Sequence, residues 1–284
     1  MMMTIDVDLE VYKALNRLSD AEKKPYNAIL RDLLKVKDAA VAPVLAQSFV
    51  TRGDSAAAAA AAAAAGEQAR PRKAPENPSM PRVAVLGAAG SIGAKVVDEA
   101  LSRGLQTIAI ARDPSKVPAR EKLKVIATDA NDPAALSKAI DGADLVVVSV
   151  KWAGADINKV LEGVRASGVR RAIVVVGCGT LMREDGRRHF IHAAEANGVA
   201  PPATVPAMRV MAALKASPDL EWTAISCPMD IRSGARTEKF RVGGEYMILD
   251  DEGVSRISEQ DFAVAILDET QAPRHVRAQF GVSY

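Results

Sequence analysis

The chain has few of the residues on which disulfide scaffolds and metal sites depend. Its 284 residues include two cysteines and three histidines. Cys178 and Cys227 form neither a CxxC pair nor a disulfide framework, which suits a reducing cytosol. His189 and His192 are three residues apart on a predicted helix, but no cysteine or acidic partner completes a metal set. We therefore predict no metal site and interpret both histidines as surface residues.

Long apolar runs and a strong charge of either sign are also missing. No stretch approaches the roughly 20 uncharged residues of a membrane span, and the N-terminus lacks the pattern of a signal peptide. The 37 basic and 35 acidic residues leave a net charge of +2, so no overall field favours nucleic acid or anionic lipid. We expect a soluble, cytoplasmic protein with a small-molecule substrate and no membrane or DNA partner.

The first 36 residues have a pattern of their own. Thr4–Asp8 alternates polar and apolar residues like a short strand with one buried face. Asp8 is suited to cap a first helix, and Pro25 to begin a second one. A strand and two short helices cannot bury an adequate core alone, so we expect residues 1–36 to assemble the protein into a homo-oligomer.

That order of elements resembles a ribbon-helix-helix unit. The sequences Thr4-Ile-Asp-Val-Asp8 and Ile29-Leu-Arg-Asp-Leu-Leu-Lys35 are similar to the N-terminal oligomerisation domain of the SeqA family. A helical hairpin extension without that ancestry is the alternative. Residues 37–80 contain an unbroken alanine run and several prolines, which indicates a flexible linker.

A glycine-rich loop follows the first apolar run after this linker. The sequence Val83-Ala-Val-Leu-Gly-Ala-Ala-Gly-Ser-Ile-Gly93 places glycines at 87, 90 and 93 between a predicted strand and a predicted helix. Gly87 allows a tight turn, Gly90 lets the backbone approach a pyrophosphate, and Gly93 lets the helix pack closely on the strand. In this context the motif predicts a dinucleotide site; an ordinary glycine turn is the alternative.

From residue 81 to 284 strand and helix patterns alternate. Apolar throughout, the strand runs suit a parallel sheet that is covered on both faces. The pattern therefore predicts an α/β fold with a Rossmann-type doubly wound parallel sheet and a small C-terminal substrate-side region. Predicted strands lie at 82–87, 106–111, 123–128, 144–150, 172–177, 222–226 and 245–250, and predicted helices at 91–103, 132–141, 157–168 and 261–269, the last with Ser258-Glu-Gln-Asp261 as a capping box.

These residues together resemble the atypical short-chain dehydrogenase/reductase family, in its NAD(P)H-binding, NmrA-like and flavin-reductase-like branch. The motifs are the glycine loop, Ala111-Arg-Asp-Pro114, Asp129-Ala130, Gly142-Ala-Asp-Leu-Val-Val-Val148 and the tail from Ser258. The resemblance implies that Gly87, Ala89, Gly90, Ser91 and Ile92 hold the pyrophosphate, that Asp129 and Ala130 approach the adenine, and that Val148 and Ser149 line the nicotinamide-side ribose. For each, routine packing or turn chemistry is the alternative.

Arg112 decides the predicted cofactor. A 2′-phosphate needs a cation where the second strand ends, whereas NAD needs an acidic group on the ribose 2′-hydroxyl. Arg112 stands at that position, and the adjacent Asp113-Pro114 is typical of a turn whose carboxylate is occupied locally. We predict NADP, with NAD as the alternative.

Catalytic residues are not evident. Typical members of the superfamily carry Tyr-x-x-x-Lys, but none of the four tyrosines here is followed four residues later by lysine. Hydride transfer to a flavin or quinone would demand less of the protein, because the acceptor's own electronics carry the reaction. Cys178, in a glycine loop near the expected nicotinamide, is either a reactive thiol or, as we favour, a small buried spacer.

Two functional hypotheses remain open. One is an NADPH-dependent oxidoreductase with a flavin, a quinone or a small carbonyl as acceptor. The other is a regulator that binds NADP without turnover and acts through its N-terminal domain. The missing tyrosine–lysine pair favours the second, and the enzyme-like C-terminal portion favours the first.

Overall fold

The computed structural model describes residues 81–198 and 201–284. The predicted oligomerisation segment 1–36 and the predicted linker 37–80 lie outside the described residues. The ribbon-helix-helix resemblance and the homo-oligomer therefore stay predictions.

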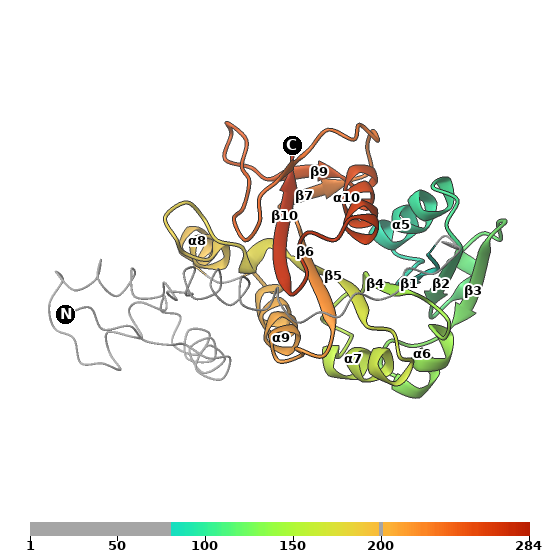
Figure 1. Cartoon of the computed structure of the whole chain (residues 1–284). Coiled ribbons are helices and arrows are strands. Elements are labelled where there is room, and N and C mark those ends of the chain that lie inside the picture. The colour runs from blue at the N-terminus through green and yellow to red at the C-terminus, as the bar shows by residue number, and fades with distance from the viewer. Residues whose placement is uncertain (1–80, 199–200) are drawn as a thin grey trace, which may run out of the picture. The chain divides into compact units, whose positions relative to one another are not determined.

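A single eight-stranded sheet organises the described part of the chain (Figure 1). Its order is β3-β2-β1-β4-β5-β6-β10-β8, with every neighbouring pair parallel except β10 and β8. The strands are β1 (Val83–Leu86), β2 (Thr107–Ala111), β3 (Leu123–Ala127), β4 (Leu145–Val148), β5 (Arg171–Gly177), β6 (Glu221–Cys227), β8 (Arg241–Val242) and β10 (Ala278–Ser283). This is the predicted Rossmann-type parallel sheet.

Helices cover both faces of the sheet, so the strands are buried on both sides (Figure 1). One core cluster packs the sheet against α6, α7 and α9, and the other packs it against α5 and α10. The helices are α5 (Ser91–Ser102), α6 (Pro133–Ala139), α7 (Ile157–Ala166), α8 (His189–Asn197), α9 (Thr204–Lys215) and α10 (Glu259–Gln271), with 3₁₀ turns η3 (Pro114–Lys116) and η4 (Cys178–Thr180). Such double coverage explains why β1 and β4, at the middle of the sheet, are apolar at every position.

Local signals in the sequence act as predicted at several boundaries. The Asp132 carboxylate accepts a hydrogen bond from the Ala135 N–H and caps α6, whose first residue is Pro133. The predicted strands up to 222–226 and the helices at 91–103, 132–141 and 157–168 all form at their expected places. None of the helices in the described part of the chain is long and apolar enough to cross a membrane.

The strand predicted at 245–250 is wrong. Gly243 and Gly244 turn the chain there: the Tyr246 N–H donates to the Gly243 carbonyl, and Gly244 has a φ of +55°. Beyond the turn, the Met247 N–H donates to the Met182 carbonyl, so this segment contacts a loop instead of the sheet. Periodicity alone could not reveal this long-range backbone pairing with Met182.

The predicted capping box at 258–261 forms only in part, and α10 begins at Glu259 rather than at Asp261. The Ser258 hydroxyl accepts from the Asp261 N–H, as predicted. The Asp261 carboxylate instead accepts hydrogen bonds from Thr237, Glu238 and the Tyr284 hydroxyl. This buried carboxylate thus holds residues 237–238 against α10, beside the small pair of strands β7 (Asp230–Arg232) and β9 (Arg256–Ser258).

Candidate functional site

The strand order reverses between β1 and β4, and the loops that follow these strands are in backbone contact. Gly87, directly after β1, has a φ of +89°. A Cβ at Gly87 would lie 2.0 Å from the Ser149 carbonyl oxygen, and the Ser149 N–H donates to the Leu86 carbonyl. Ligands of open α/β sheets bind at such a reversal, outside the carboxyl ends of the strands.

The other two glycines bring α5 onto the loop. A Cβ at Gly93 would lie 2.1 Å from the Gly87 carbonyl oxygen, and a Cβ at Gly90 would lie 3.2 Å from the same atom. The start of α5 therefore sits directly over the end of β1, with the exposed Ala89 and Ser91 and the half-buried Ile92 in this loop. Unpaired N–H groups and the positive end of the helix dipole suit a pyrophosphate there.

Arg112 and Asp113 follow β2 at the same edge of the sheet. Arg112 is exposed. The Asp113 carboxylate accepts hydrogen bonds from the Ser115 hydroxyl at 2.6 Å and the Ser115 N–H at 3.2 Å, and it pairs with Lys116 at 3.5 Å. The hydroxyl bond is the main reason why the pKa of Asp113 is lowered. The local occupation of Asp113 is confirmed, which leaves Arg112 as the group available to the expected ribose.

The loops after β3 and β4 are joined through Asn131. Its side-chain amide donates to the Gly154 carbonyl, and its side-chain oxygen accepts from the Asp156 N–H. The Asp129 carboxylate is exposed but accepts from the Asn131 N–H at 2.7 Å, while the Ala130 side chain is buried in the core. Sequence reasoning missed Asn131, whose cross-loop bonds shape this side of the predicted adenine position.

After β4 the chain passes the carboxyl end of β5. The Val148 side chain is buried in the core, so only its main chain can reach a cofactor, whereas Ser149 is half-buried. Trp152, two residues beyond Val150, donates its indole N–H to the Val175 carbonyl of β5 at 2.7 Å. This bond fixes an aromatic ring at the carboxyl ends of β4 and β5.

Two cysteines lie side by side at the ends of β5 and β6, where Gly177 pairs with Cys227 in the sheet. Burial raises the pKa of Cys178 to about 11 and that of Cys227 to about 12. Thiolate is the reactive form of cysteine, so neither thiol is activated at neutral pH. These observations favour the spacer interpretation of Cys178.

The interpretation of both histidines as surface residues is wrong for His189. His189 is 8% exposed, and its ring contacts Arg183, with 3.5 Å between Nδ1 and the guanidinium. Burial lowers its pKa to about 4, with further contributions from Arg183 and His192. His192 is half-buried and pairs with Asp185 at 3.1 Å. No group of three metal-ligating side chains occurs among the described residues.

The tyrosines in the described residues form no proton relay with lysine. The Tyr284 hydroxyl donates to Asp261 and accepts from the Ser258 N–H, a structural role. Tyr246 is 54% exposed and lies beside Met182. Neither described tyrosine therefore supplies the tyrosine–lysine pair that typical short-chain dehydrogenases carry.

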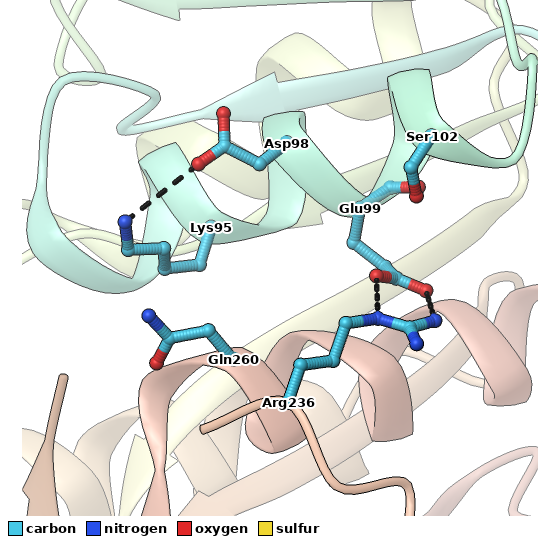
Figure 2. A pocket seen from close by; sticks show the side chains of 6 residues that line it. All are labelled: Lys95, Asp98, Glu99, Ser102, Arg236 and Gln260. Carbon is cyan, nitrogen blue, oxygen red and sulfur yellow. Dashed lines mark hydrogen bonds and ion pairs between the residues drawn. The ribbon is translucent and has the colours of Figure 1, made fainter. Parts of the chain in front are cut away.

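A hollow of about 570 Å³ lies between α5, α10 and the segment around Arg236 (Figure 2). Figure 2 shows its charges paired with one another: Arg236 donates two hydrogen bonds to Glu99, and Lys95 pairs with Asp98. Glu99 also binds Arg103 at 2.7 Å. Because these charges are paired with one another, we do not interpret the hollow as a ligand site. Its ion pairs instead hold the C-terminal region against α5.

Comparison with known proteins identifies the family. The NAD(P)H-binding family matches residues 87–270, which is more than half of the chain. The chain belongs to this family. The described fold and the family match together show a member of the NAD(P)H-binding family with a Rossmann-like parallel sheet.

Solved structures agree on this region. A crystal structure of an exported-protein candidate from Burkholderia pseudomallei is 31% identical, with a TM-score of 0.63, covering 72% of this chain and 100% of its own. An epimerase candidate from Bacteroides thetaiotaomicron is 29% identical, with a TM-score of 0.65, covering 72% and 98%. A candidate NADH-flavin reductase from Streptococcus pneumoniae is 23% identical, with a TM-score of 0.60, covering 72% and 99%.

A short-chain dehydrogenase/reductase from Veillonella parvula, solved in complex with NADP, shares the fold at 19% identity, with a TM-score of 0.60 and coverage of 72% and 94%. The family match begins at residue 87. The SeqA-like resemblance of the N-terminal segment and the cytoplasmic location stay predictions.

Proposed function

We propose that the chain is an NADPH-dependent reductase whose acceptor is a flavin, a quinone or a small carbonyl compound. The observation that carries the proposal is the backbone contact of Gly87 with Ser149 and Gly93 at the strand reversal. That contact leaves no room for side chains at Gly87 and Gly93 beside the first turn of α5, where main-chain N–H groups and the helix dipole suit a pyrophosphate.

NADPH rather than NADH is favoured by the groups after β2. Arg112 is exposed there, and the neighbouring carboxylate of Asp113 is held by Ser115 and Lys116. An acidic group free to bind a ribose 2′-hydroxyl is thus missing from these two positions, whereas a guanidinium suits a 2′-phosphate.

When bound, reduced nicotinamide supplies a hydride. The chain's own part is to bind and orient: the glycine loop would hold the pyrophosphate, and the Ser149 main chain with the anchored Trp152 would border the nicotinamide end. The protonated thiols of Cys178 and Cys227 give this edge a small, uncharged floor. Reductases named among similar proteins, such as the flavin reductase candidate, support the same reaction class.

A regulator that binds NADP without turnover is the second candidate, favoured by the missing tyrosine–lysine pair. Anaerobic oxidation of NADPH over a panel of flavins, quinones and small carbonyls separates the two. Turnover with any acceptor establishes the reductase. Tight NADPH binding by calorimetry without turnover on the panel would instead favour the regulator.

A further inference from the structure

Gly177, the last residue of β5, is a glycine that the described fold does not require. Its φ of −74° and ψ of 154° are extended values that any L residue adopts. An ideal Cβ built on Gly177 meets no atom of the described residues within 4 Å. Neither the backbone conformation nor the packing therefore excludes a side chain at this position.

Each of the other described glycines has either a positive φ or an atom within 4 Å of its Cβ position. A positive φ favours glycine whatever space is available. The remaining glycines with open Cβ positions are Gly168, Gly198, Gly244 and Gly253, and their φ values are +80°, +75°, +55° and +75°. Among the described glycines, only Gly177 combines an ordinary backbone conformation with an empty Cβ position.

A glycine at such a position costs stability, because it loses more conformational freedom on folding than alanine does. Glycine within a strand marks a bulge, a bend, or a site where a ligand or another backbone approaches closely. Residues 171–177 of β5 pair with 221–227 of β6 in unbroken register, which excludes a bulge. Since no described backbone approaches the Cβ position either, the close approach of a ligand is the explanation that remains.

The open position lies on the face of the sheet that α5 and α10 cover. Ile173 and Val175 belong to the core cluster on that face, and side chains alternate along a strand, so a Cβ at Gly177 would continue the same face. Cys227, the register partner of Gly177 on β6, packs against the same cluster. Because burial raises the pKa of Cys227, its thiol adds no charge to this space.

Gly177 lies just beyond Ser149, which borders the proposed nicotinamide position. Val148 is the register partner of Val174, so Ser149 is level with Val175 and lies on the same face as Gly177. Gly177 is two residues further along β5, roughly 6–7 Å at the rise of a strand. A molecule over Gly177 therefore adjoins the nicotinamide end of the site, where the acceptor of a hydride must lie.

We infer that Gly177 is a specificity-determining residue: the hydride acceptor lies against its main chain, and the missing side chain sets how bulky an acceptor the site admits. The inference rests on the proposed function and deepens it. A side chain at Gly177 would fill the space that a bulky acceptor occupies, so it would exclude large acceptors before small ones.

Stability of the full chain separates a ligand role of Gly177 from a structural one. Gly177→Ala should unfold at the same urea concentration as the natural chain or at a higher one, because alanine fits the open position and restricts the unfolded chain. A lower midpoint would show that the fold itself needs this glycine and would overturn the inference.

Gly179→Ala is the matched control. Gly179 lies two residues further on in η4 and also lacks a positive φ, but its Cβ would point toward Phe190 and Thr204, at 3.5 Å and 3.7 Å. Both distances are ordinary van der Waals contacts. The control therefore adds the same methyl group to the same loop, directed at other residues instead of at the open space.

Two neutral quinones that differ by one fused ring serve as probes: 2-methyl-1,4-benzoquinone and 2-methyl-1,4-naphthoquinone. Their dissociation constants are measured by calorimetry on protein saturated with NADP, so that no turnover occurs. Gly177→Val should weaken the naphthoquinone about tenfold or more and the benzoquinone less than about twofold. Gly177→Ala should act in the same direction with a smaller effect, and Gly179→Ala should leave both constants unchanged.

Unchanged binding of the naphthoquinone in Gly177→Val overturns the inference, as does an equal loss for both quinones. NADPH affinity is measured for every variant. A loss of NADPH affinity in Gly177→Val with unchanged quinone binding would assign the space to the cofactor and also overturn the inference. If the natural chain binds NADPH but neither quinone, only this inference fails. If it binds no NADPH, the proposed function itself fails.

Discussion

The carbonyl oxygen of Ser149 occupies the space that a side chain at Gly87 would need. The distance to an ideal Cβ at Gly87 is 2.0 Å, and the atom in the way belongs to the backbone of the loop after β4. The two loops that frame the proposed cofactor site are thus held together at one point, at the reversal of strand order.

Gly87→Ala should therefore destabilise the fold strongly. Gly168→Ala is the matched control, because Gly168 also has a positive φ, +80°, but nothing lies within 4 Å of its Cβ position. Both variants carry the strain of a left-handed alanine, and only Gly87→Ala adds the clash, which we expect to cost about 2 kcal/mol or more beyond the control. Urea unfolding of both variants measures the difference. Equal losses of stability in the two variants would contradict the close contact between Gly87 and the Ser149 carbonyl.

Arg112→Gln should weaken NADPH far more than NADH. Loss of a charge-assisted contact to the 2′-phosphate is worth about 1.5–3 kcal/mol, so we expect roughly a ten- to hundredfold rise in the dissociation constant for NADPH alone. Arg120→Gln is the control, since Arg120 lies in the same connection and is already paired with Asp98 at 2.6 Å. Calorimetry with both cofactors provides the measurement, and equal losses for NADPH and NADH in Arg112→Gln would show that Arg112 does not read the phosphate.

Stability should fall between pH 6.5 and pH 5 because of His189. Its pKa is about 4 in the folded state against an ordinary 6.5, so the unfolded state takes up the proton first as pH falls. The loss should be about 1–2 kcal/mol at pH 5, at ~1.4 kcal/mol per unit of pKa. His189→Gln should abolish this loss, and His192→Gln should keep it. Urea unfolding at pH 6.5 and pH 5 measures the loss of stability. The same loss in His189→Gln as in the natural chain would refute the assignment to His189.

Ile5→Asp should lower the assembly state of the full chain. The alternation in Thr4–Asp8 predicts a strand with Ile5 and Val7 in a shared core, and a carboxylate there would be buried without a partner. Thr4→Asp, on the predicted outward face, is the control. Light scattering should show a dimer or larger species for the natural chain and for the control, and a smaller one for Ile5→Asp. If the natural chain is a monomer, the prediction that residues 1–36 assemble it is wrong.

The predicted outward face of the strand at Thr4–Asp8 also argues against DNA binding. Asp6 and Asp8 would place two carboxylates per strand against phosphates, where a ribbon that reads DNA needs arginine, lysine or glutamine. We expect no tight, salt-sensitive binding of duplex DNA in a filter or anisotropy titration of the full chain. Such binding would promote the regulator over the reductase.

Sequence patterns predicted the central sheet well because its signals are local. The glycine loop, the Asp132-Pro133 cap and the uniformly apolar strands each depend on neighbours within a few residues. Helix α9 also had a signal that was overlooked: Ala207, Val210, Met211 and Leu214 form a buried face at helical spacing. No side chain caps its start, which removed the usual marker of a helix boundary.

The rim of the site could not be predicted in this way. The hairpin of residues 181–189 is closed by its own main-chain hydrogen bonds, but its place beside residues 245–247 depends on partners far along the chain, such as the Met247 N–H that donates to the Met182 carbonyl. Asn131 likewise acts on residues more than twenty positions away. Arg187 is paired with two carboxylates, whereas Arg183 has no carboxylate partner among the described residues; this difference depends on three-dimensional neighbours that no periodicity records.

The bond from Trp152 to the Val175 carbonyl has an optical consequence. It holds an indole at the edge of the sheet where nicotinamide is proposed to bind, while Trp222 lies buried near the opposite end of β6. Indole emission overlaps the absorption band of reduced nicotinamide and not that of the oxidised form. The chain therefore carries its own fluorescent donor, whose emission would report both the arrival of NADPH and the moment of its oxidation.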